Sequence, residues 1–391
     1  MPKEVYDVLV VGAGPAGGSA ALHSARLGLD TLLIEEHEKI GEPVHCGECL
    51  SEYAVENTGI RPPESVISEH VKGVRVIFPD GTASALNEKG FVLEKEKFEQ
   101  WLAGEAVKAG AELSLGTRLE GLERKNNLWE IKTNKGILKA KIVIDASGVA
   151  SVVSRKLNLN ERFESVIGIQ YELRDIPREG YLDFYIWPEL APEGYLWMIP
   201  KANGRANVGL ATTERNKAKQ FNDIFVERMG WKDKVNVKTF GGLIPASGPL
   251  KNTYSDGLML VGDAAGFTSP LFEGGSHLGL KSGEMAARVA KESVEKKDFS
   301  KAAFSKYEAM WKAEFPAYGK IIKGKNALYG FTDEELNFIA HNFPRSFDNF
   351  GLAQKMLFGL KVLAGRPSFL GKGFVPAMQA FEYSQAKFYG W

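Results

Sequence analysis

The stretch that decides the fold is Val8–Gly17, which reads VLVVGAGPAG. Its aliphatic run predicts a buried strand, and the small residues after it match the G-x-G-x-x-G pattern of a tight turn that opens a helix. Gly12 permits the turn, Gly14 lets backbone N–H groups approach a pyrophosphate, and Gly17 lets the helix pack on the strand. We expect the first turn of this helix, with Ala16, to face the phosphate through its free N–H groups and positive dipole end.

The residues that follow complete a dinucleotide-binding unit. Ser19–Leu27 is rich in small residues and predicts a helix that stops at Gly28 in a left-handed cap. The apolar run Thr31–Ile34 predicts the next strand, and Glu35 follows it directly. An acid a little over ~20 residues past the glycines is placed to accept hydrogen bonds from ribose hydroxyls. Strand, turn, helix, strand and acid together indicate a Rossmann-type unit.

A second cofactor element lies far along the chain, at Leu258–Gly266, which reads LMLVGDAAG. This apolar run ends in a small-residue turn at Gly262, and Asp263 is expected to accept from a ribityl hydroxyl. A helix then opens at Gly274, Gly275 and Ser276. Its positive end would face the pyrimidine side of a flavin, where reduced flavin carries negative charge. A nicotinamide enzyme needs only the first element, so two distant elements indicate FAD.

Three further positions are assigned to the cofactor site. Asp145 ends the strand-like run IVIDASG, which resembles the middle motif of a large FAD group of aromatic hydroxylases, halogenases and isoprenoid reductases. Gln100 lies in a predicted helix, residues 98–109, that returns to the same domain. Leu119 lies near the start of predicted strands over residues 117–138, with a hairpin turn at Asn126 and Asn127.

Composition is typical of a soluble enzyme. The chain has 391 residues, of which 44% are hydrophobic and 25% charged, which allows two or three domains. Basic and acidic residues number 49 each, so the balanced charge gives no indication of nucleic-acid binding. The apolar runs are too short to span a bilayer, and Met1–Glu4 leads directly into the first strand with no signal peptide. We therefore expect a cytoplasmic protein.

These motifs predict an α/β protein with a glutathione-reductase-like or p-hydroxybenzoate-hydroxylase-like FAD fold. The FAD domain would be discontinuous, with residues 1–60, 95–155 and 250–298. The alternating pattern between residues 165 and 211 predicts an antiparallel sheet. Residues 61–94 and 156–249 would form this substrate domain, as the roof of a cavity. Residues 299–391 predict a helical C-terminal region with aromatic faces.

The sheet segment carries a family resemblance. Pro192–Lys201 reads PEGYLWMIPK and Asn207–Leu210 reads NVGL, which resembles the Y-x-W-x-F-P-K…N-V-G pattern of archaeal geranylgeranyl reductases. Cys46–Glu48 is similar to their C-G-E/D segment, and Gly365–Leu370 to their C-terminal end. The resemblance implies FAD-dependent reduction of double bonds in the geranylgeranyl chains of archaeal ether lipids, or of geranylgeranyl diphosphate, with hydride from flavin N5.

The chain departs from the family pattern at four places. Ile199 stands where the family commonly has an aromatic, which leaves the substrate's chain length open. Cys49 replaces a glycine, and Gln100 replaces an arginine that would contact flavin or phosphate. The glycine-rich stretch before the last FAD helix reads FEGGSH, at Phe272–His277.

Two alternative functions follow from these features. Flavin-dependent halogenases carry a W-x-W-x-I-P segment in an equivalent sheet, which Tyr195–Pro200 misses by one aromatic. A monooxygenase or halogenase would let reduced flavin meet oxygen, whereas a reductase delivers hydride to its substrate. The non-catalytic alternative is an FAD electron-transfer protein, which would have no cavity long enough for a lipid.

The reductase chemistry requires a hydride on one alkene carbon and a proton on the other. Cys46, His45 and His277 lie nearest the predicted flavin in these motifs and are candidates for the catalytic site. Tyr195 and Trp197 would form an aromatic wall that stabilises developing positive charge through its π-face. A water held by the glycine turn before the last FAD helix is the alternative proton donor.

Cys46 and Cys49 are the chain's only cysteines and form C-x-x-C. A redox disulfide near the flavin is one interpretation. The other is that Cys46 and Gly47 pack against the flavin, with Cys49 in place of a small residue. Structural zinc requires four ligands, so no metal site is predicted.

The C-terminal tail is basic and apolar. Lys355, Lys361, Arg366, Lys372 and Lys387 face only Glu382 and are interleaved with Leu357, Phe358, Leu360, Phe369, Leu370 and Phe374. Such a tail is typical of a segment that lies on an anionic membrane surface, here the inner face of the cell membrane. The alternative is a terminal helix pair that closes the cavity. The sequence has no second complete dinucleotide site, so NAD(P)H or reduced ferredoxin would donate electrons transiently.

Overall fold

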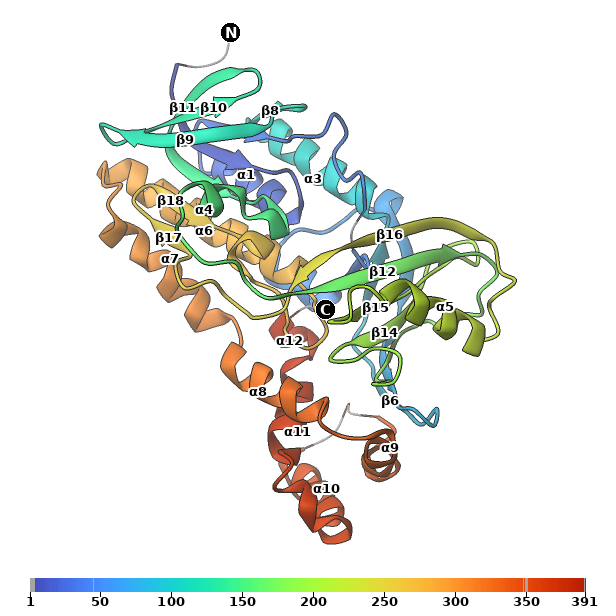
Figure 1. Ribbon diagram of the computed structural model, residues 1–391. Coiled ribbons are helices and arrows are strands. Elements are labelled where there is room, and N and C mark those ends of the chain that lie inside the picture. Colours follow the sequence, from blue (N-terminus) through green and yellow to red (C-terminus); the bar gives the residue numbers. More distant parts are fainter. Residues whose placement is uncertain (1–3, 45, 347, 349–350, 390) are drawn as a thin grey trace.

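A computed structural model describes residues 4–44, 46–346, 348, 351–389 and 391. Its described strands form sheets of eight, seven and three strands. In Figure 1 the eight-stranded sheet lies toward the N-terminal end of the molecule, and the seven-stranded sheet lies beside it. The last helices project away from both sheets, with α10 at the tip.

The eight-stranded sheet has a parallel core. Along it the strands follow the order β17-β18-β11-β1-β2-β8, and β9 and β10 extend β11. The strands are β1 (Tyr6–Val11), β2 (Thr31–Ile34), β8 (Glu112–Ser114), β9 (Leu119–Lys125), β10 (Leu128–Thr133), β11 (Gly136–Asp145), β17 (Tyr254–Ser255) and β18 (Leu258–Leu260). β1 pairs in parallel with β11 and with β2, and β11 pairs in parallel with β18. The carboxyl ends of β1, β11 and β18, which precede the three cofactor motifs, therefore lie at one edge of the sheet. Asn126 and Asn127 form the predicted hairpin turn, with φ of 50° and 64°.

Three helices cover this sheet: α1 (Pro15–Arg26), α3 (Lys95–Lys108) and α6 (Ser276–Lys296). α1 confirms the predicted helix, and Gly28 after it has φ of +77°. Small residues allow the close packing, because a Cβ on Gly17 would lie 1.8 Å from the Gly12 carbonyl oxygen. A Cβ on Gly283 of α6 would likewise lie 2.5 Å from the Ala16 carbonyl oxygen. α3 confirms the predicted returning helix but begins three residues earlier, at Lys95.

The seven-stranded sheet follows the order β16-β12-β15-β14-β13-β5-β6. Its strands are β5 (Gly73–Ile77), β6 (Ala83–Leu86), β12 (Ser165–Leu173), β13 (Tyr181–Tyr185), β14 (Tyr195–Pro200), β15 (Ala206–Thr212) and β16 (Asn236–Pro245). The predicted antiparallel pairing is found for all neighbours except β13 and β5, which run parallel. A parallel pair needs a crossover connection, and here the chain passes through the FAD sheet between β5 and β13.

Residues 61–94 divide between two sheets. β5 and β6 belong to the large sheet, whereas β4 (Ile67–Val71) and β7 (Gly90–Leu93) pair with β3 (Cys49–Ser51) in the three-stranded sheet. The small sheet therefore attaches directly to the cysteine segment. The domain boundaries given above stay a prediction.

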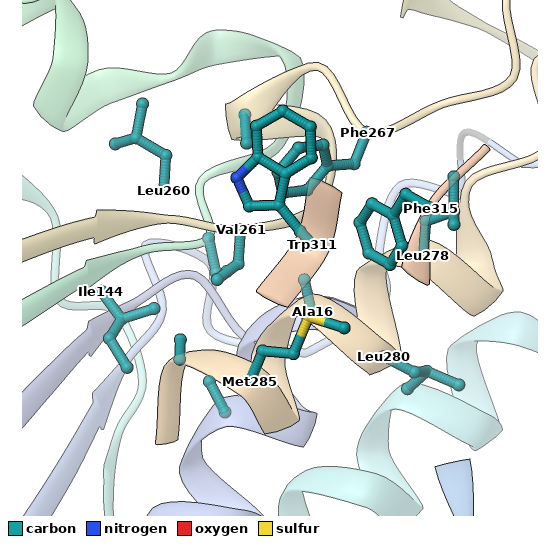
Figure 2. Packing of buried hydrophobic residues seen from close by; sticks show 14 of the residues in the cluster. Ala16, Ile144, Leu260, Val261, Phe267, Leu278, Leu280, Met285, Trp311 and Phe315 are labelled. Atoms are coloured by element: carbon teal, nitrogen blue, oxygen red, sulfur yellow. The ribbon is translucent and has the colours of Figure 1, made fainter. Parts of the chain in front are cut away.

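The remaining helices lie between strands along the chain or form the C-terminal region. They are α2 (Glu52–Thr58), α4 (Val152–Lys156), α5 (Ala218–Arg228), α7 (Lys301–Glu314), α8 (Tyr318–Leu328), α9 (Asp333–Asn342), α10 (Leu352–Gly365), α11 (Phe374–Tyr383) and α12 (Ala386–Tyr389). Figure 2 shows Trp311 of α7 beside Phe267 and Phe315, which anchors α7 against the turn after β18. Among the described residues, no helix combines the length and the apolar character that crossing a membrane requires.

Candidate active site

A cavity of about 810 Å³ lies where the two large sheets meet. One part is bounded by the turns after β1 and β18 and by the start of α6, including Gly14, Ala16, Gly262 and Gly275. The rest is bounded by aromatic and aliphatic side chains of the seven-stranded sheet and of α10 and α11. The glycine turns predicted to hold a cofactor thus open into the same space as the apolar wall.

The turn after β1 leaves room and hydrogen-bond donors for a phosphate. Gly12 has φ of +99°, which favours glycine. Gly14 precedes α1 without a side-chain cap, so the first N–H groups of the helix stay available. A Cβ on Gly14 would meet no atom of the described residues within 4 Å. This geometry fits a pyrophosphate at the helix N-terminus.

Glu35 holds this turn from the second strand. Its Oε2 accepts a hydrogen bond from the Ala13 backbone N–H at 2.9 Å, and its Oε1 accepts one from the His37 backbone N–H at 3.0 Å. Glu35 is not among the residues that line the cavity. The contact of Glu35 with a ribose stays a prediction. Its hydrogen bonds with Ala13 and His37 connect the glycine turn after β1 to the loop after β2.

At the other end, Asp263 and Lys95 line the cavity together. Burial raises the pKa of Asp263 to about 6, and the nearby Lys95 lowers it in part. Burial opposes the charge of Lys95, but Cys46, Glu99 and Asp263 raise its pKa overall. Lys95 is therefore a cation at the cofactor end of the cavity, which sequence analysis missed because it stands outside the quoted motifs.

Four predicted cofactor residues lie behind the cavity wall. Asp145 is fully buried, and its two carboxylate oxygens accept hydrogen bonds from Ser147, Val153 and Ser154. Asp145 therefore organises the loop that follows β11. Gln100 donates to the Ile40 carbonyl oxygen at 3.0 Å. Leu119 is buried at the start of β9, and Gly17 lies beneath the turn in α1. None of the four lines the cavity, and their predicted cofactor contacts stay predictions.

The cysteine segment borders the cavity as predicted. Cys46, Gly47 and Cys49 all line it, and both cysteines are free thiols. Burial raises the pKa of the Cys49 thiol well above its usual range. The Cys46 carbonyl oxygen accepts a hydrogen bond from Gln170, whose Oε1 accepts one from the Trp197 indole at 3.0 Å. His45 lies outside the described residues.

Glu48 fixes this segment through a buried ionic network. Its φ of +73° is unusual for a residue other than glycine. One carboxylate oxygen accepts from the Lys95 backbone N–H at 2.9 Å. The other accepts from Lys201 Nζ at 2.7 Å and from Asn207 Nδ2 at 2.6 Å. Glu48 of the C-G-E segment thus contacts Lys201 and Asn207 of the P-K…N-V-G segment. Through these contacts the substrate sheet holds the cysteine segment in place.

An aromatic wall faces the cavity from the seven-stranded sheet. Tyr195 lies 5.5 Å from Trp197 and 5.1 Å from Phe272 between ring centroids. The Tyr195 hydroxyl donates to the Phe272 carbonyl oxygen at 2.7 Å. Ile199 also lines the cavity, and a Cβ on Gly47 would lie 3.0 Å from its Cδ1. Tyr195, Trp197 and Cys46 thus line one cavity, and their catalytic roles stay predictions.

His277 does not join them. It is buried near the start of α6, where its Nε2 lies 2.8 Å from Asn57 Oδ1 of α2, and it is not among the residues that line the cavity, although its neighbour Ser276 is. Burial lowers the pKa of His277 to about 4. The imidazole is therefore neutral near pH 7, which makes it a poor proton donor.

Glu273 is a titratable residue in the cavity wall that sequence analysis mentioned only as part of FEGGSH. Its side chain is 1% exposed, and neither carboxylate oxygen has a hydrogen-bond partner among the described residues. The signal for it was an acidic residue directly before the two glycines that open the last FAD helix.

The C-terminal tail is less basic at its surface than expected. Lys355 pairs with Glu382, Arg366 with Glu334 and Lys372 with Glu335. The expectation that the tail cations face only Glu382 is therefore wrong, because α9 supplies two more acids. The apolar residues of α10 divide, with Phe358 buried and Leu357 and Leu360 exposed.

Comparisons with known proteins agree with this site. Residues 7–156 match a family model described as FAD dependent oxidoreductase, and residues 164–244 match the geranylgeranyl reductase catalytic domain. A digeranylgeranylglycerophospholipid reductase of Methanocaldococcus jannaschii is 35% identical, over 94% of this chain and 97% of that protein. The chain belongs to the digeranylgeranylglycerophospholipid reductase family. Digeranylgeranylglycerophospholipid reductase 2 of Methanopyrus kandleri is 34% identical, over 87% and 91% of the two chains.

Solved structures confirm the fold of this digeranylgeranylglycerophospholipid reductase family member. A geranylgeranyl bacteriochlorophyll reductase-like protein of Thermoplasma acidophilum has a TM-score of 0.86 and 32% identity, over 95% of this chain and 99% of that one. The flavin-dependent brominase Bmp2 has a TM-score of 0.73 at 17% identity, which shows the fold alone. The predicted FAD fold, FAD cofactor and enzyme class are confirmed: the protein is an FAD-dependent oxidoreductase and a geranylgeranyl reductase.

Proposed function

We propose that this enzyme reduces the double bonds of geranylgeranyl chains carried by an ether phospholipid. The observation that carries the proposal is the continuity of the cavity from the cofactor turns to an apolar wall and on to α10. Tyr195, Trp197 and Ile199 supply that wall, and apolar surface is what an isoprenoid chain buries on binding. An electron-transfer protein would need no such cavity.

One group of residues would bind the cofactor, and another would bind the substrate. Gly12, Gly14 and Ala16 would hold the pyrophosphate, Glu35 the ribose, and the start of α6 the flavin ring. Reduced FAD supplies a hydride when bound. The chain must hold the alkene beside it, exclude water and deliver a proton. The aromatic wall would orient the alkene, and Cys46 would border the flavin.

Substrate choice tests this proposal. The FAD-loaded enzyme, kept reduced by dithionite without oxygen, is given either digeranylgeranylglycerophospholipid or geranylgeranyl diphosphate, and the products are followed by mass. We expect two hydrogens gained per double bond, with the phospholipid preferred. No mass gain with either substrate would refute the proposal. Oxygen uptake that depends on substrate would instead support the monooxygenase or halogenase alternative.

We infer that α10 brings the cavity to a membrane surface. Leu352, Met356, Leu357 and Leu360 are 60–75% exposed, and three of them, Leu352, Met356 and Leu360, also line the cavity. An exposed apolar helix face at a cavity entrance fits a lipid surface from which a chain can slide into the protein. Since ion pairs engage most nearby cations, apolar insertion would contribute more than charge. The enzyme would then act at the inner face of the cell membrane.

Liposome binding tests this inference. The double variant Leu357→Glu with Leu360→Glu should bind vesicles of archaeal ether lipid at least tenfold more weakly than the wild type. Ile137→Glu is a matched control, because Ile137 is 69% exposed on the FAD sheet, far from α10. Equal binding by the double variant and the wild type would contradict the inference.

We infer that the electron donor binds transiently. NADH, NADPH and reduced ferredoxin can be compared by the rate at which each bleaches the oxidised flavin under anaerobic conditions. The physiological donor should reduce the flavin at least as fast as lipid turnover, and a donor that reduces it more slowly is excluded.

A further inference from the structure

Glu273 is a buried acid in the cavity wall that has no hydrogen-bond partner among the described residues. It lies between the aromatic wall and the start of α6, in the left-handed region with φ of +46°. Its side chain is 1% exposed, and both carboxylate oxygens lack hydrogen-bond partners among the described residues. Buried polar groups are nearly always paired, so an unpaired acid in a strained turn indicates a functional role.

The groups around Glu273 come from two other elements. Lys325 of α8 places Nζ 3.9 Å from Glu273 Oε1. Tyr195 of β14 is close enough to influence the acid electrostatically, and so is Tyr329, which follows α8. Glu193 also acts on Tyr329, and Cys49 on Tyr195. The charged and titratable groups that act directly on Glu273 are therefore one cation and two phenols.

This surrounding keeps a proton on Glu273. Burial raises its pKa to about 8, while Lys325 and Tyr195 lower it in part. The carboxyl group is therefore mostly neutral near pH 7, in the manner of an acid held ready to donate. A glutamate with an ordinary pKa would already have lost its proton.

Resting on the function proposed above, we propose that Glu273 is the proton source for alkene reduction and passes its proton into the cavity through the hydroxyl of Tyr195. Tyr195 lines the cavity and is in contact with Phe272, the residue before Glu273. The Glu273 carboxylate oxygens themselves are buried, so the acid acts through a neighbour. Tyr195 both lowers the pKa of Glu273 and lines the substrate space, and its hydroxyl, which donates to the Phe272 carbonyl oxygen in this structure, would turn toward the alkene to deliver the proton.

The step balances in atoms and charge. The alkene gains a hydride from reduced FAD on one carbon and the Tyr195 hydroxyl proton on the other. The O–H bond of the Glu273 carboxyl breaks as its proton moves to the Tyr195 oxygen, so Tyr195 ends unchanged. Burial raises the pKa of Tyr195 well above its usual range, so a lasting phenolate is unfavourable and the proton must be replaced in the same step. The Glu273 carboxylate left behind faces the Lys325 ammonium and regains a proton from solvent.

The test compares Glu273→Gln with Glu193→Gln. Glu193 is an exposed glutamate that also has a left-handed φ, of +52°, so it controls for the loss of an acid in such a turn. Reduced, FAD-loaded protein is mixed with digeranylgeranylglycerophospholipid, and flavin reoxidation is followed from pH 6 to pH 10. Wild type and Glu193→Gln should slow above pH 8. Glu273→Gln should be 10- to 100-fold slower at pH 7 and lose that dependence. Tyr195→Phe should behave like Glu273→Gln.

A measurement without lipid separates the two proposals. Infrared difference spectra between pH 6 and pH 10 should show a protonated-carboxyl C=O band in wild-type protein that titrates near pH 8 and is missing in Glu273→Gln. An active wild type with an unchanged Glu273→Gln rate and pH profile would overturn the role of Glu273 alone. A wild type that reduces no lipid, yet shows the titrating band, would overturn the proposed function and the destination of the proton, but not the buried neutral acid. Absence of the band would overturn the proton source itself.

Discussion

Replacing Lys201 with methionine would test whether the buried ionic network holds the active site together. Lys201 is 2% exposed, and its Nζ lies 2.7 Å from Glu48, 3.0 Å from Glu94 and 3.7 Å from Glu172. Methionine keeps most of the length of the side chain but removes the terminal ammonium group and its charge. Breaking a buried ion pair from one side costs about 3–5 kcal/mol, because the remaining charge is uncompensated. We expect a loss of about 3 kcal/mol, since Arg205 still contacts Glu94 and Glu172.

The loss should depend on pH in a defined direction. Burial opposes ionisation of Glu94, but Arg205 and Lys201 outweigh it and hold its pKa at about 2, below the ordinary 4.5. A carboxylate with a depressed pKa stabilises the fold above its unfolded pKa and loses that contribution as the pH falls through the folded value. Without Lys201 part of this contribution is gone, so the variant should differ most from wild type at pH 7 and less near pH 3, closer to the folded pKa of Glu94.

Urea unfolding of FAD-free protein, followed by tryptophan fluorescence, measures this difference. Lys219→Met is the matched control, because Lys219 is an exposed lysine paired with Asp223, and its unfolding midpoint should match that of wild type. The double variant Lys201→Met with Glu48→Gln should recover part of the loss, since it removes the stranded charge. A loss below about 1 kcal/mol at pH 7, or equal losses at about pH 7 and about pH 3, would refute the reasoning.

The remaining predictions concern the cofactor turn, the cysteines and the buried acid. Glu35→Ala should lose FAD at least tenfold more readily in equilibrium dialysis, because it loses the Ala13 contact, whereas the exposed neighbour Glu36→Ala should not; equal retention would contradict the first motif. Cys46→Ser should retain FAD but change single-turnover rates more than Cys49→Ser, and wild-type turnover would assign Cys46 to packing. Glu273→Gln should become more stable relative to wild type as the pH rises from 4.5 to 8. In this range folded wild type holds a proton on Glu273 that the unfolded chain has lost, so wild type loses stability with rising pH. The gain should approach about 1.4 kcal/mol per pH unit, and a gain independent of pH would contradict a raised pKa.

The sequence predicts those parts of the fold that depend on local patterns. The glycine turn at Gly12, the cap at Gly28 and the turn at Asn126 each need a backbone conformation that few residues adopt, so their identity reveals their geometry. The strands of the substrate sheet could also be predicted, because their apolar residues alternate with polar ones. The parallel pairing of β13 with β5 is not, because it joins strands about a hundred residues apart and depends on how the chain returns from the FAD sheet.

In the candidate site too, residues in local motifs could be predicted from the sequence, whereas contacts between distant segments could not. Cys46, Tyr195 and Asp263 stand in motifs and line the cavity, whereas Asp145 stands in a motif but accepts hydrogen bonds from the loop that follows it. Gln100, which replaces the family's arginine, donates to the Ile40 carbonyl oxygen. Lys95 takes a place in the cavity that no local pattern indicates. The contact of Glu48 with Lys201 spans 153 positions, so two quoted motifs could be recognised separately without showing that they touch. Burial has the largest effect on the pKa of Glu273, and burial is a property of the whole fold.

The most direct test of the central claim is an anaerobic single turnover. FAD-loaded protein is reduced chemically, freed of excess reductant and mixed with digeranylgeranylglycerophospholipid, while flavin absorbance and lipid mass are followed together. A reductase should reoxidise its flavin without oxygen, and the lipid should gain two hydrogens for each flavin reoxidised. Flavin that stays reduced until oxygen is admitted, with no change in lipid mass, would contradict the claim.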